Sequence, residues 1–203
     1  MSVSLDPYVT SSFLGVIGFP LTGEAVLKGR SVFATRMGEN VGSPAVTLVS
    51  DPTDQRSLAA NKMDAEGLAS HRVPLIDAGV LTGFVHNSYT ARRSGTQSTG
   101  SAVRSMKTTP TVGCRALTLQ EGTQSQEELM AQLGEGVIVK SVSGLHSGVN
   151  PVSGDFSTGA EGLMFRDGQL AEPVREFTIA STLQRMLSDV VAVGNDVEQL
   201  PSG

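Results

Sequence analysis

The chain has 203 residues, which is enough to bury a sizeable core in one large domain or two small ones. Its net charge is −5 at pH 7, and this acidic balance argues against nucleic acid or an anionic membrane as a direct partner, because either would need a basic face. The single cysteine, Cys114, excludes an internal disulfide and an all-cysteine zinc site.

No stretch of the sequence approaches about 18 consecutive apolar residues, and the first residues lack both the basic and the apolar part of a secretory signal. We therefore expect no membrane span and a cytoplasmic location. The 23 glycines, set against only 4% aromatic residues, indicate many tight turns and close backbone contacts, as in a strand-rich domain.

The N-terminal part of the chain predicts two helices followed by short strands. Pro20 interrupts an apolar stretch, so we expect one helix over residues 9–17 and a second, short helix at about residues 24–27. Residues 45–49 predict a strand that the turn sequence DPTD ends. Residues 73–85 predict a hairpin that turns at Asp-Ala-Gly.

The C-terminal part begins with a short alternating strand over residues 115–119. Ser125 and Glu128 then have the spacing of a helix capping box, and a glycine at position 134 suits the end of that helix. Residues 137–142 predict a strand. Residues 163–170 predict a hairpin with Asp-Gly at its turn.

A final helix is predicted up to Gly194, because apolar residues recur there at helical spacing. Its apolar face would consist of Ile179, Leu183, Met186, Leu187, Val190 and Val191. The predicted strands come in hairpins and do not alternate with helices. The expected fold class is therefore α+β, with a mainly antiparallel β-sheet built from hairpins and a few peripheral helices.

Two short motifs resemble functional sequences without completing them. The segment GTQSTGS, residues 95–101, has the glycine spacing of a phosphate-binding loop but lacks its lysine. The segment GLHSG, residues 144–148, has a histidine where a nucleophile elbow needs its serine. Neither motif therefore predicts a nucleotide site or a serine hydrolase.

The three histidines, His71, His86 and His146, are far apart in the sequence and form no HExxH spacing. A metal site that folding assembles from His146 and Asp155 stays open as an alternative.

The segment NSYTARR, residues 87–93, follows the predicted hairpin and contains the candidate binding residues Asn87, Tyr89, Arg92 and Arg93. In an acidic protein, paired arginines at a glycine-rich turn could hold a carboxylate of a peptide. The alternative is that the two arginines form salt bridges within the chain or between subunits.

Residues 144–162, GLHSGVNPVSGDFSTGAEG, are rich in glycine and serine. We expect them to form turns between the predicted strand and the hairpin that follows. Asn150 and Asp155 are suited to cap such turns through hydrogen bonds from side chain to backbone. Together with His146 they are further candidates for peptide binding or for an interface.

The motif NPVSGDFSTGAEG, followed by EPVREFTIAS, resembles the C-terminal domain of the TldD/PmbA (TldE) metallopeptidase family. The run EGLASHRVPLIDAGVLTGFVHNSYTARRSGTQSTGSAVR resembles the same domain, so the likeness covers nearly the whole chain. Within the family it is closer to the PmbA/TldE branch than to TldD. The resemblance implies a single domain over residues 1–203, truncated at both ends, with the N-terminal domain of the family absent.

The resemblance also implies a metal-dependent peptidase that works as a TldD–TldE heterodimer. Catalysis in the family belongs to a HExxxH helix in the N-terminal domain of TldD and to a cysteine near the TldD C-terminus. This sequence contains no HExxxH, and Cys114 lies in VGCRA, outside the cysteine motif. No catalytic or metal-binding residue therefore transfers to this chain, and zinc or a similar divalent metal is expected on a TldD-like partner.

Three hypotheses follow. In the first, the chain is a domain or subunit of a TldD/TldE-type peptidase that pairs with a TldD-like catalytic subunit or with itself, and contributes the substrate channel and an assembly surface. In the second, it is an independently catalytic metalloenzyme that uses His146 and Asp155. In the third, it is an interaction protein without proteolytic activity, in keeping with the older family label of gyrase modulator.

Overall fold

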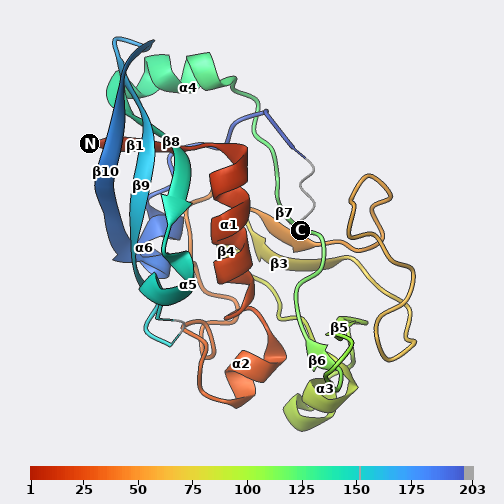
Figure 1. The fold of residues 1–203 in the computed structure, drawn as a ribbon. Coiled ribbons are helices and arrows are strands. Elements are labelled where there is room, and N and C mark those ends of the chain that lie inside the picture. The colour runs from red at the N-terminus through yellow and green to blue at the C-terminus, as the bar shows by residue number, and fades with distance from the viewer. Residues whose placement is uncertain (151, 199–203) are drawn as a thin grey trace.

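Two four-stranded sheets and a two-stranded ribbon carry the fold in the computed structural model, which describes residues 1–150 and 152–198 (Figure 1). The first sheet, the long sheet, has the strand order β1 (Ser2–Leu5), β8 (Glu135–Ser143), β9 (Asp155–Arg166) and β10 (Gln169–Thr182). β1 runs parallel to β8, and the other two pairs are antiparallel. The expected α+β class with a mainly antiparallel sheet is confirmed.

The second sheet, the short sheet, is antiparallel throughout, with the order β4 (Val80–Leu81), β3 (Val73–Asp77), β2 (Leu48–Ser50) and β7 (Leu117–Leu119). The predicted strands over residues 45–49 and 115–119 correspond to β2 and β7, with shifted or shortened ends. The ribbon consists of β5 (Ala102–Val103) and β6 (Thr111–Val112).

The predicted hairpin of residues 73–85 is confirmed as β3 and β4. Ala78 and Gly79 between the two strands have φ angles of 44° and 83°. Positive φ at both central residues is typical of a type I′ turn, whose twist matches that of the strands. A Cβ on Gly79 would lie 2.3 Å from the carbonyl oxygen of Gly42, so only glycine fits at this position.

The first predicted helix is α1 (Pro7–Gly18), which lies between the two sheets in Figure 1. The carboxylate of Asp6 accepts a hydrogen bond from the backbone N–H of Tyr8 at 3.1 Å and thereby caps the helix. The buried Phe13 of this helix meets Phe156 of β9 edge to face, with ring centroids 5.2 Å apart. The second predicted helix is α2 (Gly23–Leu27), and Thr22 caps it.

The main core fills the space between the sheets around α1. Its fully buried members come from almost every element and include Val9, Leu21, Phe33, Leu48, Leu75, Ile76, Leu81, Val85, Val139 and Leu183. A small second cluster of Met130, Ile138 and Phe165 lies between the long sheet and α4 (Gln126–Leu133). The predicted capping box of α4 is confirmed, because Ser125 and Glu128 each accept a backbone hydrogen bond from the other.

The prediction of a long final helix is wrong. Ile179 belongs to β10, where it pairs with Thr158 of β9, and the helix α6 covers only Leu183–Ser188. The β-branched residues around Ile179 favour an extended strand once β9 offers a partner. Of the predicted apolar face, Leu183 and Leu187 are buried by the helix, while Val190 and Val191 follow its end.

No helix in the described part of the chain is long and apolar enough to cross a membrane.

Candidate functional site

The segment NSYTARR forms the helix α3 (Ser88–Ser94), and the prediction of a turn there is wrong. The side-chain oxygen of Asn87 accepts a hydrogen bond from the N–H of Thr90 at 2.8 Å, and the Thr90 hydroxyl accepts one from the N–H of Asn87 at 3.1 Å. Gly95, with φ of 67°, ends the helix. Sequence reasoning missed this helix because its capping box is Asn-x-x-Thr and not the more familiar Ser-x-x-Glu.

Of the four candidate binding residues in this segment, three reach solvent. Asn87 is buried and its side-chain oxygen serves the helix cap. Tyr89 is 64% exposed, and Arg92 and Arg93 are exposed in the last turn of α3. Neither arginine forms an ion pair with another described residue of the chain. The guanidinium groups are therefore available to a carboxylate from outside the chain.

His86 ties α3 to its surroundings. Its backbone N–H donates to the hydroxyl of Thr99 at 2.7 Å, and its carbonyl accepts from the N–H groups of Thr99 and Ser101 at 3.1 and 3.4 Å. Its buried imidazole lies 3.3 Å from the Thr90 hydroxyl and against Gly23 of α2, where an added Cβ would approach Nδ1 to 2.3 Å. Burial lowers the pKa of His86, so the neutral imidazole is favoured at this position.

The glycine-rich stretch over residues 144–162 is only partly the turn region that the sequence predicts. Its second half, from Asp155 onward, forms the first part of β9. In that strand a Cβ on Gly162 would lie 2.0 Å from the carbonyl oxygen of Ile138 in β8. Gly162 is therefore needed for the close approach of two strands and not for a turn.

In the turn that remains, Asn150 acts as the expected capping residue. Its side-chain oxygen accepts hydrogen bonds from the N–H groups of Val152 and Ser153 at 3.0 and 3.3 Å. The Asp155 carboxylate accepts a hydrogen bond from the hydroxyl of Ser153. Both polar side chains are exposed at the start of β9 and are engaged locally.

His146 belongs to the short helix α5 (Leu145–Gly148), but its side chain lies outside the described part of the structure. The candidate pairing of His146 with Asp155 therefore stays a hypothesis. Within the residues that the structure does describe, no three His, Cys, Asp or Glu side chains are arranged to hold a metal ion. Burial raises the pKa of the Cys114 thiol to about 12, which keeps it protonated and a poor nucleophile.

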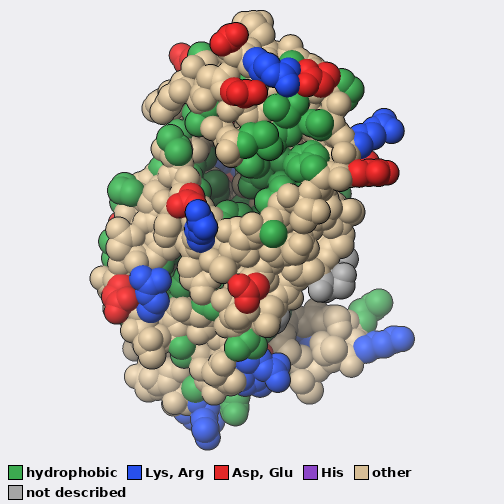
Figure 2. All heavy atoms as spheres, turned by 90° about the vertical axis from the view of Figure 1, so that its left-hand side faces the viewer, with side chains coloured by type: hydrophobic (Ala, Val, Ile, Leu, Met, Phe, Trp, Pro, Cys, Tyr) green, Lys and Arg blue, Asp and Glu red, His purple; other side chains and the backbone are tan. Residues whose placement is uncertain are grey.

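The long sheet presents an open edge and an apolar hollow. Among the described strands, β10 pairs only with β9, so one side of this strand of 14 residues is free of sheet partners. Figure 2 shows a hollow lined by hydrophobic side chains on the side of the molecule where β9 and β10 lie. Half-buried apolar side chains of this region that pack on the core are Met164, Val174, Phe177, Ile179 and Met186.

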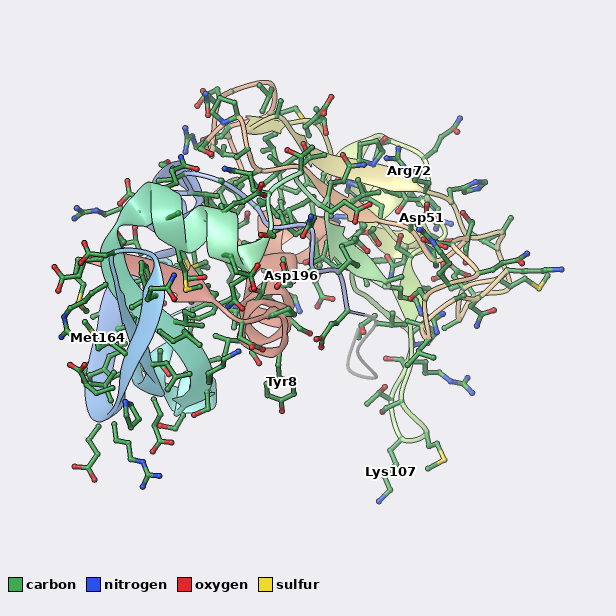
Figure 3. The ribbon with its side chains drawn as sticks, turned by 90° about the horizontal axis from the view of Figure 1, so that it is seen from above. Tyr8, Asp51, Arg72, Lys107, Met164 and Asp196 are labelled. Atoms are coloured by element: carbon green, nitrogen blue, oxygen red, sulfur yellow. The ribbon has the colours of Figure 1, made fainter. Side chains whose placement is uncertain are left out.

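A separate cavity of about 360 Å³ lies between the ribbon and the loop before β3, at Asn61, Asp64, Ala65, Val103, Arg104 and Arg115. The buried Asp64 carboxylate accepts hydrogen bonds from the backbone N–H groups of Glu66 and Leu68 in its own loop and of Ala102 in β5. In Figure 3, Lys107 points away from the body at the tip of the loop between β5 and β6. Arg72 and Asp51, also labelled there, approach each other to 3.7 Å.

Comparison with known proteins gives one consistent result. The whole chain, residues 1–203, matches the family described as PmbA/TldA metallopeptidase C-terminal domain. It is 30% identical over 190 residues to the metalloprotease PmbA of Escherichia coli O157:H7, and the aligned region covers 94% of this chain and 40% of that protein. It is 29% identical to a metalloprotease of Methanothermobacter thermautotrophicus, with 94% of this chain and 42% of that protein covered. The chain thus spans less than half the length of these curated relatives.

Solved structures show the same relationship. A candidate modulator of a DNA gyrase from Thermotoga maritima superposes with a TM-score of 0.89 at 32% identity, covering 98% of this chain and 45% of that one. TldE from Thermococcus kodakarensis superposes with a TM-score of 0.88 at 27% identity, covering 95% of this chain and 44% of that one.

Proposed function

The chain belongs to the PmbA/TldA metallopeptidase family, and we propose that it serves a peptide-processing metalloprotease as a domain without a catalytic metal of its own. In this role it forms part of the substrate channel and an assembly surface. A TldD-like subunit in a heterodimer supplies the HExxxH helix and the zinc or similar divalent ion. The chain contributes backbone and apolar surface, which hold a peptide while the partner hydrolyses it.

The observation that carries this proposal is the free edge of β10 beside the apolar hollow of Figure 2. An extended peptide binds to such an edge by adding a strand, so that backbone hydrogen bonds give affinity without demanding a particular sequence. The half-buried Val174, Phe177 and Ile179 would receive alternate side chains of the peptide. A strand of the partner subunit would fit the same edge, which is why the proposal includes assembly.

The polar candidates take a supporting role in this proposal. Arg92 and Arg93 would hold carboxylates of the substrate, because both are exposed and lack an ion-pair partner among the described residues. Tyr89 beside them offers an exposed aromatic ring to a neighbouring side chain. Asn150 and Asp155 would shape the end of β9 and not contact the scissile bond.

The test is to mix this chain with a TldD-like protein that carries HExxxH and to follow the cleavage of an unfolded peptide. We expect cleavage by the mixture, none by either protein alone, and loss of cleavage with a chelator. The two proteins should also elute together in size-exclusion chromatography.

Metal analysis separates the alternatives. Stoichiometric zinc on this chain alone, lost in His146→Ala, would instead support an independent metalloenzyme that uses His146 and Asp155. A mixture that forms a stable complex yet never cleaves would favour the interaction protein without proteolytic activity, in line with the gyrase-modulator description of one structural relative.

A further inference from the structure

The charges of this chain are separated along its sequence and in space. Residues 78–120 contain no Asp or Glu and five cationic residues, which are Arg92, Arg93, Arg104, Lys107 and Arg115. The whole chain has a net charge of −5, so the residues outside this segment carry a net charge of −10. We name residues 86–115 the basic lobe, because all five cations lie within them.

The basic lobe is one structural unit. The carbonyl of His86 receives the N–H groups of Thr99 and Ser101, and the N–H of Gly113 donates to the carbonyl of Ser101 at 3.1 Å. These bonds join α3 to the ribbon of β5 and β6, and Figure 1 shows the three elements together at the lower right.

The cations of the lobe have no ion-pair partners among the described residues. Outside the lobe, seven of the ten Lys and Arg residues form an ion pair: Lys28, Arg36, Arg56, Arg72, Lys140, Arg166 and Arg185. Two acidic residues, Asp64 and Glu66, accept hydrogen bonds from the backbone of the lobe. Asp64 accepts three N–H groups, and Glu66 accepts the N–H of Ser88 at 2.9 Å.

We propose that the basic lobe is a docking surface for an acidic polypeptide segment, rich in Asp and Glu. Arginine binds carboxylates through two parallel hydrogen bonds, and α3 offers two exposed arginines side by side. Arg104 and Arg115 line the cavity of about 360 Å³ together with Asp64, whose carboxylate is held by backbone N–H groups. The exposed Tyr89 and Met106 add apolar contacts for the residues between the acids.

An acidic polypeptide fits this surface better than a nucleic acid does. A long nucleic acid would extend past the lobe toward the rest of the chain, whose net charge is −10, whereas a short acidic peptide can bind within the lobe. Single-stranded nucleic acid also binds through several stacked aromatic side chains, and residues 78–120 contain only Phe84 and Tyr89. Arg92 and Arg93 also hold carboxylates in the proposed peptidase role; the proposal extends this binding to the whole lobe, where docking requires no cleavage.

The test is the binding of a fluorescent peptide of alternating Glu and Ser to the 203-residue chain, followed by anisotropy. We expect binding that weakens as salt is raised across the range in which the Debye length falls below about 10 Å. The double variant Arg92→Gln/Arg93→Gln and the double variant Arg104→Gln/Arg115→Gln should each weaken it about fivefold, as expected for the loss of two exposed charge pairs. The matched control is Arg36→Gln/Arg185→Gln, which removes the same charge outside the lobe and should change binding less than about twofold.

Each other outcome decides against the proposal. Equal weakening by the control would mean that net charge alone governs binding. Tighter binding of single-stranded DNA of equal charge, or of phosphatidylserine vesicles, would assign the lobe to another class of partner. Salt-sensitive dimerisation in sedimentation, abolished by the lobe variants, would show that a second copy occupies the lobe. Circular dichroism confirms that each variant is folded, and cleavage by the complex, measured separately, tests the peptidase role independently.

Discussion

The long sheet and the basic lobe are stabilised in different ways. In the long sheet, strands of up to 14 residues pair over most of their length and pack apolar side chains on both faces. In the basic lobe, strands of two residues and a helix of seven are held by hydrogen bonds around the buried His86. The sheet therefore depends on close backbone contact and the lobe on satisfied polar groups, and substitutions distinguish the two.

The largest effect is expected for Gly162→Val in the long sheet. The added Cβ would lie 2.0 Å from the carbonyl oxygen of Ile138, so β8 and β9 would have to separate. We expect a loss of more than about 4 kcal/mol in the free energy of unfolding, measured by urea denaturation. The control is Gly15→Ala in α1, where the new methyl group would meet no atom within 4 Å apart from its chain neighbours and the adjacent backbone of its own helix, and a gain of about 0.5–1 kcal/mol is expected. Similar losses in both variants would contradict the role given to Gly162.

The next largest effect is expected for Gly23→Ala at the border of the lobe. The methyl group would lie 2.3 Å from Nδ1 of His86, so the buried ring must move. We expect a loss of about 2 kcal/mol, as for other overpacked sites. A double-mutant cycle with His86→Ala measures the coupling, because the clash disappears with the ring. Additive losses would show that Gly23 acts through something other than His86.

A smaller effect is expected for Asn87→Ala, which removes the cap of α3. The N–H of Thr90 would lose its partner in a buried position, and a loss of about 1–2 kcal/mol follows. Amide hydrogen exchange should accelerate in α3 and leave the long sheet unchanged. Asn87→Asp should retain most of the stability, since aspartate caps equally well. If both variants lost the same stability, the amide would matter for another reason.

The smallest expected effect is a dependence of folding stability on pH, which arises from the buried His86 of the lobe. Burial lowers the pKa of this imidazole in the folded chain, so the unfolded chain binds the proton first as the pH falls. The neutral imidazole therefore contributes its full share to the free energy of unfolding above the unfolded pKa of about 6.5, and this contribution is lost as the pH drops through the lower folded pKa. Denaturation of the wild type and of His86→Gln at pH 8 and pH 5 should show a steeper fall in the wild type. Parallel curves would rule out His86 as the source.

Local signals in the sequence predicted those parts of the fold that depend on adjacent residues. Ala78 and Gly79 form the predicted hairpin turn, and Ser125 with Glu128 forms the predicted cap, because each involves residues within one turn. The region around Ile179 could not be predicted in the same way. Ile179, Leu183 and Leu187 recur at a spacing of four, which suits a helix, and only the distant β9 makes Ile179 part of a strand.

The candidate site shows the same limit. Arg92 and Arg93 were recognisable as candidates from residue type alone, but their exposure depends on α3. The start of α3 was not recognised, because the polar side chains of Asn-x-x-Thr suit ligand binding as well as helix capping. Asn87 was a candidate for the same reason and is instead a buried cap. The charge of the basic lobe, by contrast, is present in the sequence as a run without acids, but the unpaired state of its cations required the structure.

The parallel pairing of β1 with β8 has a consequence for the order of folding. Ser2 pairs with Gly136, so β1 meets its partner only after more than a hundred further residues have been synthesised. At about 5–20 residues per second this interval is on the order of 10 s, which is long compared with the formation of local helices and hairpins. A chain arrested before Gly136 should therefore leave β1 open to a protease that the complete chain resists. β1 is synthesised long before β8 and can pair in the long sheet only after β8 has emerged.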